Sequence, residues 1–294
     1  MDLRSGVSLI VNPAAGGGRA ERVLPEAQAG LARLGIDHHV ERTRGLDHAR
    51  ELAKAAIDTG ETAVTLGGDG LVGCVAGELS GTDGVLGVLP GGRGNDFART
   101  LGLPLEVGPA CDTLATGRER QIDVGDVEGR PFIGIASCGF DSEANRIANE
   151  TTLVKGDLVY AYGALRALAA WKPARFELDL DDRERLAFPG FSVGACNTKA
   201  YGGGMFVAPA AEIDDGLFDV VMYSQGTKRR FLYNLTKTFK GRLQDSPSVH
   251  VVRARKVRIS ADRQFMLYAD GDPIAELPAT LTLRQRALRV IAPA

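Results

Sequence analysis

The chain has 294 residues, of which 44% are hydrophobic and 24% charged, and its formal net charge is −2. These values are typical of a globular protein and indicate no general attraction to nucleic acid or to an anionic membrane. At about 150 residues per domain, the length predicts two domains. No run of about 18 apolar residues is present, and the start of the chain is too polar for a signal peptide. The four cysteines are far apart and form no metal-binding pattern, which favours a reducing cytoplasm without structural zinc.

The first part of the chain repeats the order strand, glycine-rich turn, helix. Three short apolar runs are the predicted strands: residues 7–11, 62–66 and 85–89. Helical patterns begin at Glu21 after the first turn and recur at 45–57 and 105–116. This alternation predicts an α/β domain with a parallel sheet, in which ligands bind at the carboxyl ends of the strands.

The turn after the second of these strands carries the most informative motif, Gly67-Gly68-Asp69-Gly70. Glycine lets backbone N–H groups approach a ligand closely, and the helix N-terminus that follows favours anions. The carboxylate of Asp69 would repel phosphate unless a cation lies between them. The motif therefore predicts phosphate together with Mg²⁺, which points to a nucleotide. A tight turn with a capping aspartate is the alternative.

The other two turns are also rich in glycine. One is Asn12-Pro13-Ala14-Ala15-Gly16-Gly17-Gly18, and the other is Pro90-Gly91-Gly92-Arg93-Gly94-Asn95-Asp96. Three such turns at one edge of a sheet strengthen the nucleotide interpretation. The signatures GxxxxGK[ST] and GxGxxG do not follow these strands, which argues against P-loop NTPases and Rossmann dehydrogenases.

From Asp126 onward the pattern changes to short segments that are rich in β-forming residues and interrupted by Gly and Pro. This pattern predicts an antiparallel β-sandwich. The expected strands are 132–136, 175–180, 188–196, 218–223, 249–259 and 265–269, with helices at 158–171 and 228–240. We place the boundary near 123–129, which gives domains at 1–124 and 125–294. Residues 281–290 are expected to form a last strand pair, and the final ten or so residues belong either to the second domain or, by returning, to the first.

The charge is unevenly distributed along the chain. The segment Lys228–Arg258 has ten basic residues and one acidic residue, Asp245, so its local net charge is +9. Such a cluster can hold a protein on anionic lipid headgroups, at about 1 kcal/mol per residue near the surface. A solvated helix and one exposed strand face would explain the same pattern.

Seven motifs occur in the order typical of one family, and over nearly its whole length the chain resembles bacterial diacylglycerol kinases and sphingosine kinase-type lipid kinases. The motifs are Asn12-Pro13, Gly67 to Gly70, Pro90-Gly91-Gly92 with Asn95 to Ala98, Asp123-Val124-Gly125, Gly139-Phe140-Asp141, Ala208-Pro209-Ala210 with Asp214-Asp215-Gly216, and Asp270-Gly271-Asp272. The resemblance implies a nucleotide-binding α/β domain, a β-sandwich and an active site in the cleft between them. It also implies ATP-dependent phosphorylation of a lipid hydroxyl, with diacylglycerol to phosphatidic acid as the default reaction.

Phosphoryl transfer requires positioning, charge neutralisation and removal of the hydroxyl proton, and the resemblance implies residues for each task. The implied nucleotide-binding residues are Asn12, Pro13, Gly16, Thr43, Gly67, Gly68, Asp69, Gly70, Gly92, Arg93 and Asn95. The implied metal ligands are Asp69, Asp96 and Asp123 around a catalytic Mg²⁺, and Asp215 with the carbonyls of Glu212 and Leu217 around a structural Mg²⁺. Asp272 matches the general base, and Asp69 is the second implied catalytic residue. Without the resemblance, caps and turns explain several of these aspartates, and Asp270 to Pro273 suits a plain hairpin turn.

Four residues depart from the family pattern. Leu71 and Cys74 replace a threonine and a glutamate after the Asp69 turn, and Arg93 replaces a threonine. An arginine at that position can reach a phosphate directly. Asp272 replaces the usual glutamate, and a misplacement of about 1 Å can cost 10²-fold in rate. These departures leave open a kinase for another alcohol (a sphingoid base, a glycolipid or a non-lipid metabolite) or a catalytically weak ATP-binding regulatory protein.

NAD kinases share the Gly67 to Gly70 turn, and we expect their resemblance to stop there. The expected partners are a lipid substrate and, transiently, an anionic membrane surface, with no nucleic acid. Edge strands of the sandwich could pair between two copies of the chain, so a homodimer is left open. The expected location is the cytoplasm, with peripheral attachment to the membrane. Candidates for the lipid pocket, each equally typical of an ordinary core, are Phe140, Leu153, Tyr160, Leu165 and Met205.

Overall fold

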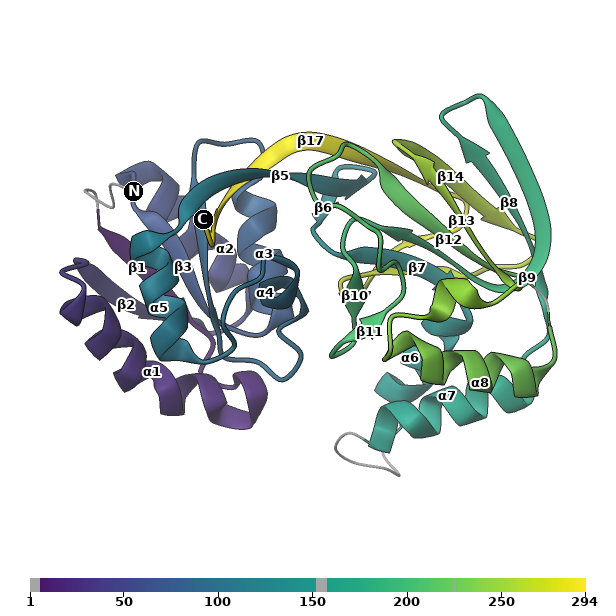
Figure 1. Cartoon of the computed structure of the whole chain (residues 1–294), viewed down its shortest axis with the longest axis horizontal. Helices are drawn as coiled ribbons and strands as arrows, with labels where there is room; N and C mark the ends of the chain where they lie inside the picture. The colour runs from purple at the N-terminus through teal and green to yellow at the C-terminus, as the bar shows by residue number, and fades with distance from the viewer. Residues whose placement is uncertain (1–5, 152–157, 225) are drawn as a thin grey trace.

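The computed structural model describes residues 6–151, 158–224 and 226–294, and it consists of an α/β half and a β-sandwich half (Figure 1). The α/β half contains four parallel strands in the order β4-β3-β1-β2: β1 (Val7–Val11), β2 (His38–Arg42), β3 (Thr62–Gly67) and β4 (Val85–Pro90). All five residues of β1 are buried, as expected for a parallel strand that is covered on both faces. The predicted α/β domain with a parallel sheet is confirmed.

Helices cover both faces of this parallel sheet. One apolar core joins the strands to α1 (Ala15–Arg33) and α5 (Val107–Thr116), and another joins them to α2 (Leu46–Thr59), α3 (Asp69–Leu79) and α4 (Asp96–Thr100). Helix α1 starts at Ala15 but is kinked, and its regular part begins after Gly18, two residues before the predicted start at Glu21. Its three glycines, Gly16 to Gly18, have left-handed φ values of 60°, 66° and 83°, so this stretch is a tight turn that precedes the regular helix.

The second half contains two antiparallel sheets that share the long strand β9 (Glu184–Cys196). One sheet adds β7 (Ile135–Gly139), β15 (Met266–Ala269), β16 (Asp272–Glu276), β12 (Phe218–Ser224) and β13 (Val249–Ala254). The other adds β8 (Ala174–Leu180), β14 (Lys256–Ala261), β17 (Ala279–Ala292), β5 (Arg118–Val127) and β6 (Arg130–Phe132). A single apolar core that includes Phe132, Phe176 and Phe218 lies between the sheets, so the predicted antiparallel sandwich is confirmed.

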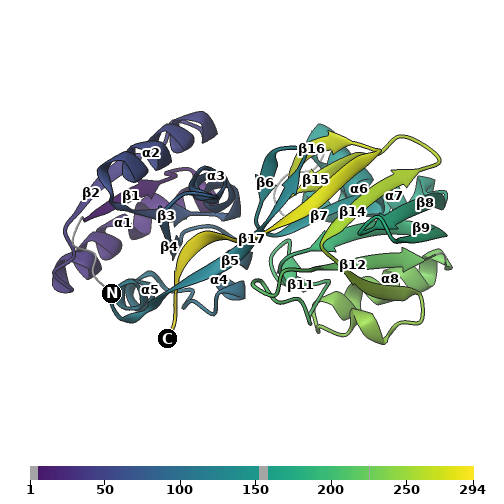
Figure 2. The ribbon, with the colours of Figure 1, turned by 90° about the horizontal axis from the view of Figure 1, so that it is seen from above.

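Two strands pass from one half to the other, and Figure 2 shows them crossing between the halves. β17 pairs with β14 at its start, with β5 along most of its length, and with β4 at Arg289 and Val290. The predicted strand pair at 281–290 is therefore wrong: these residues form one strand, and its end joins the first sheet. The predicted strand 249–259 is also wrong, because the chain breaks at Arg255 into β13 and β14. The proposed boundary at residue 124 falls inside β5.

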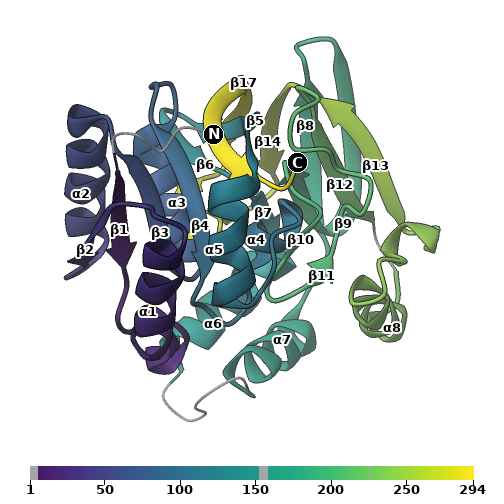
Figure 3. The same ribbon diagram turned by 60° about the vertical axis from the view of Figure 1, so that its left-hand side comes forward.

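Within the described residues, three helices and a small hairpin complete the sandwich half (Figure 3). They are α6 (Phe140–Glu150), α7 (Leu158–Ala170), α8 (Lys228–Thr238) and the pair β10 (Ala200–Tyr201) and β11 (Met205–Phe206), with a short 3-10 turn at Leu243–Asp245. The helices predicted at 158–171 and 228–240 are confirmed. Among the helices of the described ranges, none is both long enough and apolar enough to span a bilayer.

Candidate functional site

The three glycine-rich turns touch one another at the carboxyl ends of β1, β3 and β4. The backbone N–H of Gly91 donates to the carbonyl of Gly67 at 2.8 Å. A Cβ atom on Gly16 would lie 2.7 Å from the carbonyl oxygen of Gly91, and one on Gly92 would lie 2.4 Å from the Cα atom of Gly68. Because these contacts are with backbone atoms, only glycine allows the turns to approach so closely.

Side chains beside the turns fix their shape. The Oδ1 atom of Asn12 accepts the N–H of Ala14 at 3.1 Å. The guanidinium of Arg19 donates to the carbonyl of Gly92 at 3.3 Å, which ties the first turn to the third. Asn95 closes its own turn, since its amide accepts the N–H of Gly92 at 2.9 Å and donates to the same residue's carbonyl at 3.2 Å. Asn95 therefore shapes the cradle through the backbone.

Two further predicted nucleotide-binding residues lie at the border of this cradle. Thr43 follows β2, and its N–H donates to the carbonyl of Val11 at 2.8 Å. The side chain of Arg93 is exposed and reaches toward the first turn, where its Nη2 atom lies 3.8 Å from the Cβ position of Gly17. The third turn thus places a cation over the first one.

Asp69 and Asp96 form the acidic pair of the site. A Cβ atom on Gly94 would lie 3.1 Å from Oδ2 of Asp69 and 3.2 Å from Oδ2 of Asp96, so the two carboxylates flank that glycine. Oδ1 of Asp69 accepts the N–H of Phe97 at 3.1 Å. Burial raises the pKa of Asp69, the Phe97 N–H opposes this shift, and the negative charge of Asp96 adds to it.

Asp96 also connects the two halves of the molecule. Its Oδ2 atom accepts the N–H of Gly203, in the turn between β10 and β11, at 2.7 Å. Its Oδ1 atom is buried and has no hydrogen-bond partner within the ranges that the structure describes. A carboxylate pair with one free buried oxygen suits a hard divalent cation. The described residues contain no cluster of three His, Cys, Asp or Glu side chains, so a cation here would need ligands from phosphate and water.

Asp123 is placed differently from the other two predicted magnesium ligands. It is fully buried. Its Oδ2 atom accepts the N–H of Gly216, and its Oδ1 atom accepts the N–H of Arg286, both at 2.7 Å. In this arrangement the carboxylate joins the 214–216 turn to β17.

The turn predicted to bind a structural Mg²⁺ contains an arginine contact. Oδ1 of Asp215 accepts the N–H of Leu217 at 3.0 Å, and Oδ2 contacts the guanidinium of Arg253. Arg253 also lies 4.0 Å from Asp219, whose pKa is raised by burial and by the charge of Glu212. Oδ2 of Asp215 and Oδ2 of Asp219 are buried and have no hydrogen-bond partner among the described residues, and Arg253 lies against both. The metal-binding roles implied for Asp215, Glu212 and Leu217 stay predictions.

The Asp270 to Asp272 motif forms the tip of the β15–β16 hairpin. Ala269 pairs with Asp272, and the two turn residues, Asp270 and Gly271, have φ values of 52° and 96°. The segment is thus a hairpin turn, a geometry that is compatible with both the plain-turn and the general-base interpretations. Asp272 is exposed and lies near Cys74, a residue of α3. Burial raises the pKa of Cys74, and the negative charge of Asp272 adds to this rise. The role of Asp272 as general base stays a prediction.

The carboxylate of Asp270 holds this hairpin in place. It accepts three backbone N–H groups, from Ile133 at 2.8 Å, Gly134 at 2.9 Å and Ile135 at 3.2 Å. Its Oδ2 atom lies 3.6 Å from the Cβ position of Gly73 in α3, so the hairpin faces the α/β half. Burial raises the pKa of Asp270 to about 6, against the effect of the three N–H donors.

Sequence reasoning did not assign a role to Asp141, although it belongs to one of the quoted motifs. Its carboxylate hydrogen-bonds with the side chains of Tyr201 and Ser192, and burial raises its pKa to about 6. It lines a narrow cavity of about 40 Å³ together with apolar side chains of α8 and its surroundings. These apolar residues are Met205, Val207, Phe231, Leu235 and Leu243.

The predicted lipid-pocket residues are dispersed. Met205 lines the cavity beside Asp141, and Phe140 packs edge-on against Trp171 in the aromatic core. Leu165 is 60% exposed on α7. Leu153 and the side chain of Tyr160 lie outside the described residues.

Two family models match the chain, one on each half. The family model of the diacylglycerol kinase catalytic domain matches residues 6–127, and that of the YegS C-terminal NAD kinase beta sandwich-like domain matches residues 134–292. A diacylglycerol kinase of Mycobacterium tuberculosis is 35% identical, with 98% of this chain and 95% of the relative aligned. A diacylglycerol kinase of Bacillus subtilis is 28% identical, with 97% and 95% aligned.

Solved structures show the same fold. A diacylglycerol kinase of Bacillus anthracis superposes with a TM-score of 0.77 at 22% identity, covering 98% of this chain and 97% of that one. An NAD kinase of Archaeoglobus fulgidus in complex with ATP superposes with a TM-score of 0.51 at 12% identity, covering 97% and 92%. The expectation that the NAD kinase resemblance stops at the Gly67 to Gly70 turn is therefore wrong for the fold, because the likeness continues through the sandwich.

Proposed function

Because the chain belongs to the diacylglycerol kinase family and is a kinase, we propose that it transfers the γ-phosphate of ATP to the free hydroxyl of diacylglycerol and so produces phosphatidic acid. One observation carries this proposal: the Asp69 and Asp96 carboxylates lie together beside three glycine-rich turns that touch one another. Backbone N–H groups at these turns can bind phosphate oxygens, and the carboxylates can bind the accompanying cation.

The turns and Arg93 would bind the nucleotide. The start of α3 and the left-handed run at Gly16 to Gly18 present backbone N–H groups at the edge of the sheet. Arg19 holds the cradle together, and Arg93 reaches over it. Asp69 and Asp96 would hold Mg²⁺, which when bound neutralises negative charge on the phosphates.

The hairpin over α3 would supply the proton acceptor. In the transfer, the substrate oxygen forms a bond to the γ-phosphorus while the bond from that phosphorus to the bridging oxygen of ADP breaks. The substrate hydroxyl must lose its proton, and we assign its acceptance to the exposed carboxylate of Asp272. Asp270, through its three N–H bonds, positions the hairpin that carries Asp272.

The cavity beside Asp141 is our candidate for the lipid end of the site. Its wall is apolar, and its one carboxylate already accepts hydrogen bonds from hydroxyl groups. A lipid hydroxyl could take the place of such a partner. At about 40 Å³ the cavity is too small for an acyl chain, so substrate binding would require its walls to move apart. The corresponding place of action is the cytoplasmic surface of a membrane.

A phosphorylation assay with the purified protein tests the proposal. The protein would be incubated with Mg²⁺ and ATP labelled at the γ-phosphate, in parallel with diacylglycerol, a sphingoid base and NAD, and the products separated by chromatography. We expect label in phosphatidic acid. Label in the sphingoid base alone would keep the lipid kinase chemistry and change the substrate, and label in none of the three would contradict the proposal.

A kinase for a non-lipid substrate is the second candidate, and one observation favours it. The fold likeness to an NAD kinase extends over 97% of the chain. Label appearing only in NADP in the same assay would decide for this alternative.

A further inference from the structure

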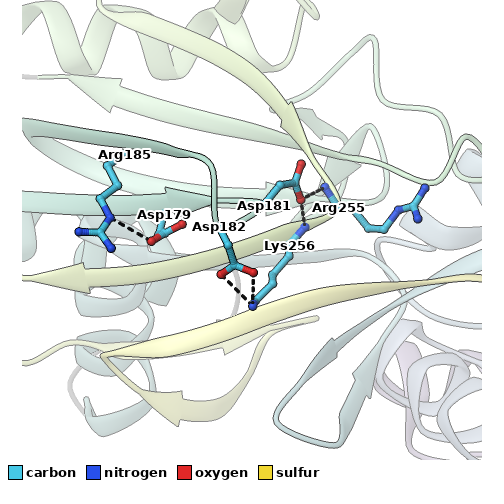
Figure 4. A network of polar contacts seen from close by, with 6 residues as sticks. All are labelled: Asp179, Asp181, Asp182, Arg185, Arg255 and Lys256. Atoms are coloured by element: carbon cyan, nitrogen blue, oxygen red, sulfur yellow. Dashed lines mark hydrogen bonds and ion pairs between the residues drawn. The ribbon is translucent and has the colours of Figure 1, made fainter.

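The basic segment Lys228–Arg258 occupies two separate places in the molecule. In its later part, on β13 and β14, two of the four cations, Arg253 and Lys256, have acidic partners. Arg253 contacts Asp215, and Nζ of Lys256 lies 2.8 Å and 2.9 Å from the two carboxylate oxygens of Asp182 (Figure 4). The backbone N–H groups of Arg255 and Lys256 also donate to Asp181. The charges of Arg253 and Lys256 are therefore balanced locally.

The earlier part of the segment is α8, whose sequence has no acidic residue. Its inner face buries Phe231, Asn234 and Thr238. Positions spaced by three and four residues place Arg229, Leu232 and Tyr233 on the opposite side, and Phe239 and Lys240 follow just after the helix ends at Thr238. We use the name α8 outer face for the exposed residues Arg229, Leu232, Tyr233, Phe239 and Lys240 together with the half-buried Lys237.

The α8 outer face combines exposed apolar side chains with positive charge. Only five large hydrophobic side chains are exposed in the described ranges, and three of them are here: Leu232 at 40%, Tyr233 at 63% and Phe239 at 61%. No carboxylate of the described residues forms an ion pair with Arg229, Lys237 or Lys240. Lys237 instead lies 5.2 Å from the centre of the Tyr233 ring.

We propose that the α8 outer face docks on the surface of an anionic lipid bilayer. Tyrosine and phenylalanine side chains favour the membrane interface, and lysine and arginine are attracted to anionic headgroups at about 1 kcal/mol each. Helices that combine these two properties lie in the plane of the interface with their apolar side chains inserted. The proposal rests on the proposed function, in that the bilayer is also the source of the lipid substrate.

The position of the cavity favours a bilayer over other anionic partners. The inner face of α8 contributes Phe231 and Leu235 to the wall of the cavity that contains Asp141. The same helix therefore separates this cavity from the docked surface. A nucleic acid or an acidic protein would complement the positive charge of this face, but neither would account for the apolar cavity behind the helix.

Vesicle sedimentation with the full-length protein tests the docking surface, in the absence of ATP. Vesicles of phosphatidylcholine alone would be compared with vesicles containing about one third phosphatidylglycerol, at low and high salt. Lys237→Gln with Lys240→Gln should weaken binding to the anionic vesicles roughly 30-fold, since each charge is worth about fivefold. Tyr233→Ser with Phe239→Ser should also weaken it. The matched control is on α2, where Leu46→Ser with Lys54→Gln changes one exposed apolar and one exposed basic residue and should have no effect.

A second measurement separates this proposal from the proposed function. Phosphorylation of a short-chain, water-soluble diacylglycerol should be equal in the wild type and in all α8 variants, whereas phosphorylation of long-chain diacylglycerol in vesicles should fall in the α8 variants alone. If even the wild type phosphorylates neither substrate, the proposed function fails, and the vesicle binding still decides the docking. Equal vesicle binding by the wild type and the α8 variants, or wild-type binding to RNA or to itself through α8 in place of vesicles, would overturn the docking proposal.

Discussion

Asp123 has both carboxylate oxygens occupied by backbone N–H groups, and its fully buried position leaves them no alternative partner in water. We therefore expect Asp123→Asn to destabilise the protein by about 2–4 kcal/mol, because the amide NH₂ group would face an N–H donor. Chemical denaturation with and without Mg²⁺ measures this. A stability loss independent of Mg²⁺ supports the positioning role seen here. A wild type that loses the same stability when Mg²⁺ is removed would instead support the magnesium role implied by the resemblance.

Asp141 should make stability depend on pH. Its pKa in the folded protein is about 6, above the ordinary value of 3.8, so the folded state keeps a proton that the unfolded chain releases. Stability from this group is complete below about pH 4 and is lost as the pH rises to about 6. Asp141→Asn removes this titration. The difference in the free energy of unfolding between the variant and the wild type should therefore shift by roughly 2–3 kcal/mol in favour of the variant between pH 4 and pH 8. Unfolding at both pH values checks this, with the exposed Asp58→Asn as control; identical pH profiles for wild type and Asp141→Asn would contradict it.

Single residues were predictable from the sequence where a motif fixes the backbone, and less so elsewhere. The glycines of the three turns could be identified because their conformation demands glycine. The partners of Asp123 and Asp270 could not, since they come from segments far away in the chain. Leu71, a departure from the family pattern, is buried at 3% exposure directly beneath the Gly67 turn, a packing role that its isolated position in the sequence did not reveal.

At the scale of elements, the contacts between turns are the most sensitive feature of the site. Gly92→Ala should destabilise the protein by about 1–3 kcal/mol and weaken ATP binding, because the added methyl would collide with the backbone of Gly68. Thermal unfolding and nucleotide titration measure both effects. The control is Gly70→Ala, where no atom lies within 4 Å of the added Cβ and stability should not fall. Equal unfolding temperatures for the two variants would contradict this account of the turns.

Strands with apolar residues on both faces were predicted correctly, because burial between two helix layers leaves a continuous apolar run. β2 has the sequence HHVER and is only partly buried, so no such run marks it. The break at Arg255 between β13 and β14 has no glycine or proline to signal it. Helix α6 was not predicted either, because it follows β7 directly, with no loop between the two elements.

For the whole molecule, β5 and β17 matter most because each strand pairs in both halves. We expect the halves to unfold together in one transition. Trp171, the single tryptophan, lies in the core of the sandwich half and reports its unfolding by fluorescence, while loss of ATP binding reports the α/β half. Coincident denaturant midpoints are predicted. Two separated midpoints would show that the crossing strands do not couple the halves.

The two-part organisation was predictable from the sequence, because the change from helix-and-strand alternation to short β segments is visible in composition. The return of the final residues to the first domain was one of two alternatives that the sequence left open, and the pairing of Arg289 with Val85 decides for it. The partner strand could not be predicted, since these residues are distant in sequence and share no local pattern. The hydrogen bond from Gly203 to Asp96 also joins the two halves, and it could not be predicted because the two residues are distant in sequence.

The central claim is that Asp69 and its neighbours support transfer of phosphate from ATP to a lipid. The most direct measurement is incorporation of labelled γ-phosphate into pure diacylglycerol by the wild type and by Asp69→Asn, with ATP binding measured in parallel. We predict that labelled phosphatidic acid forms with the wild type and falls at least about 10²-fold with Asp69→Asn, while the variant remains folded. Equal label with both proteins, or no label from a wild type that binds ATP, would contradict the account.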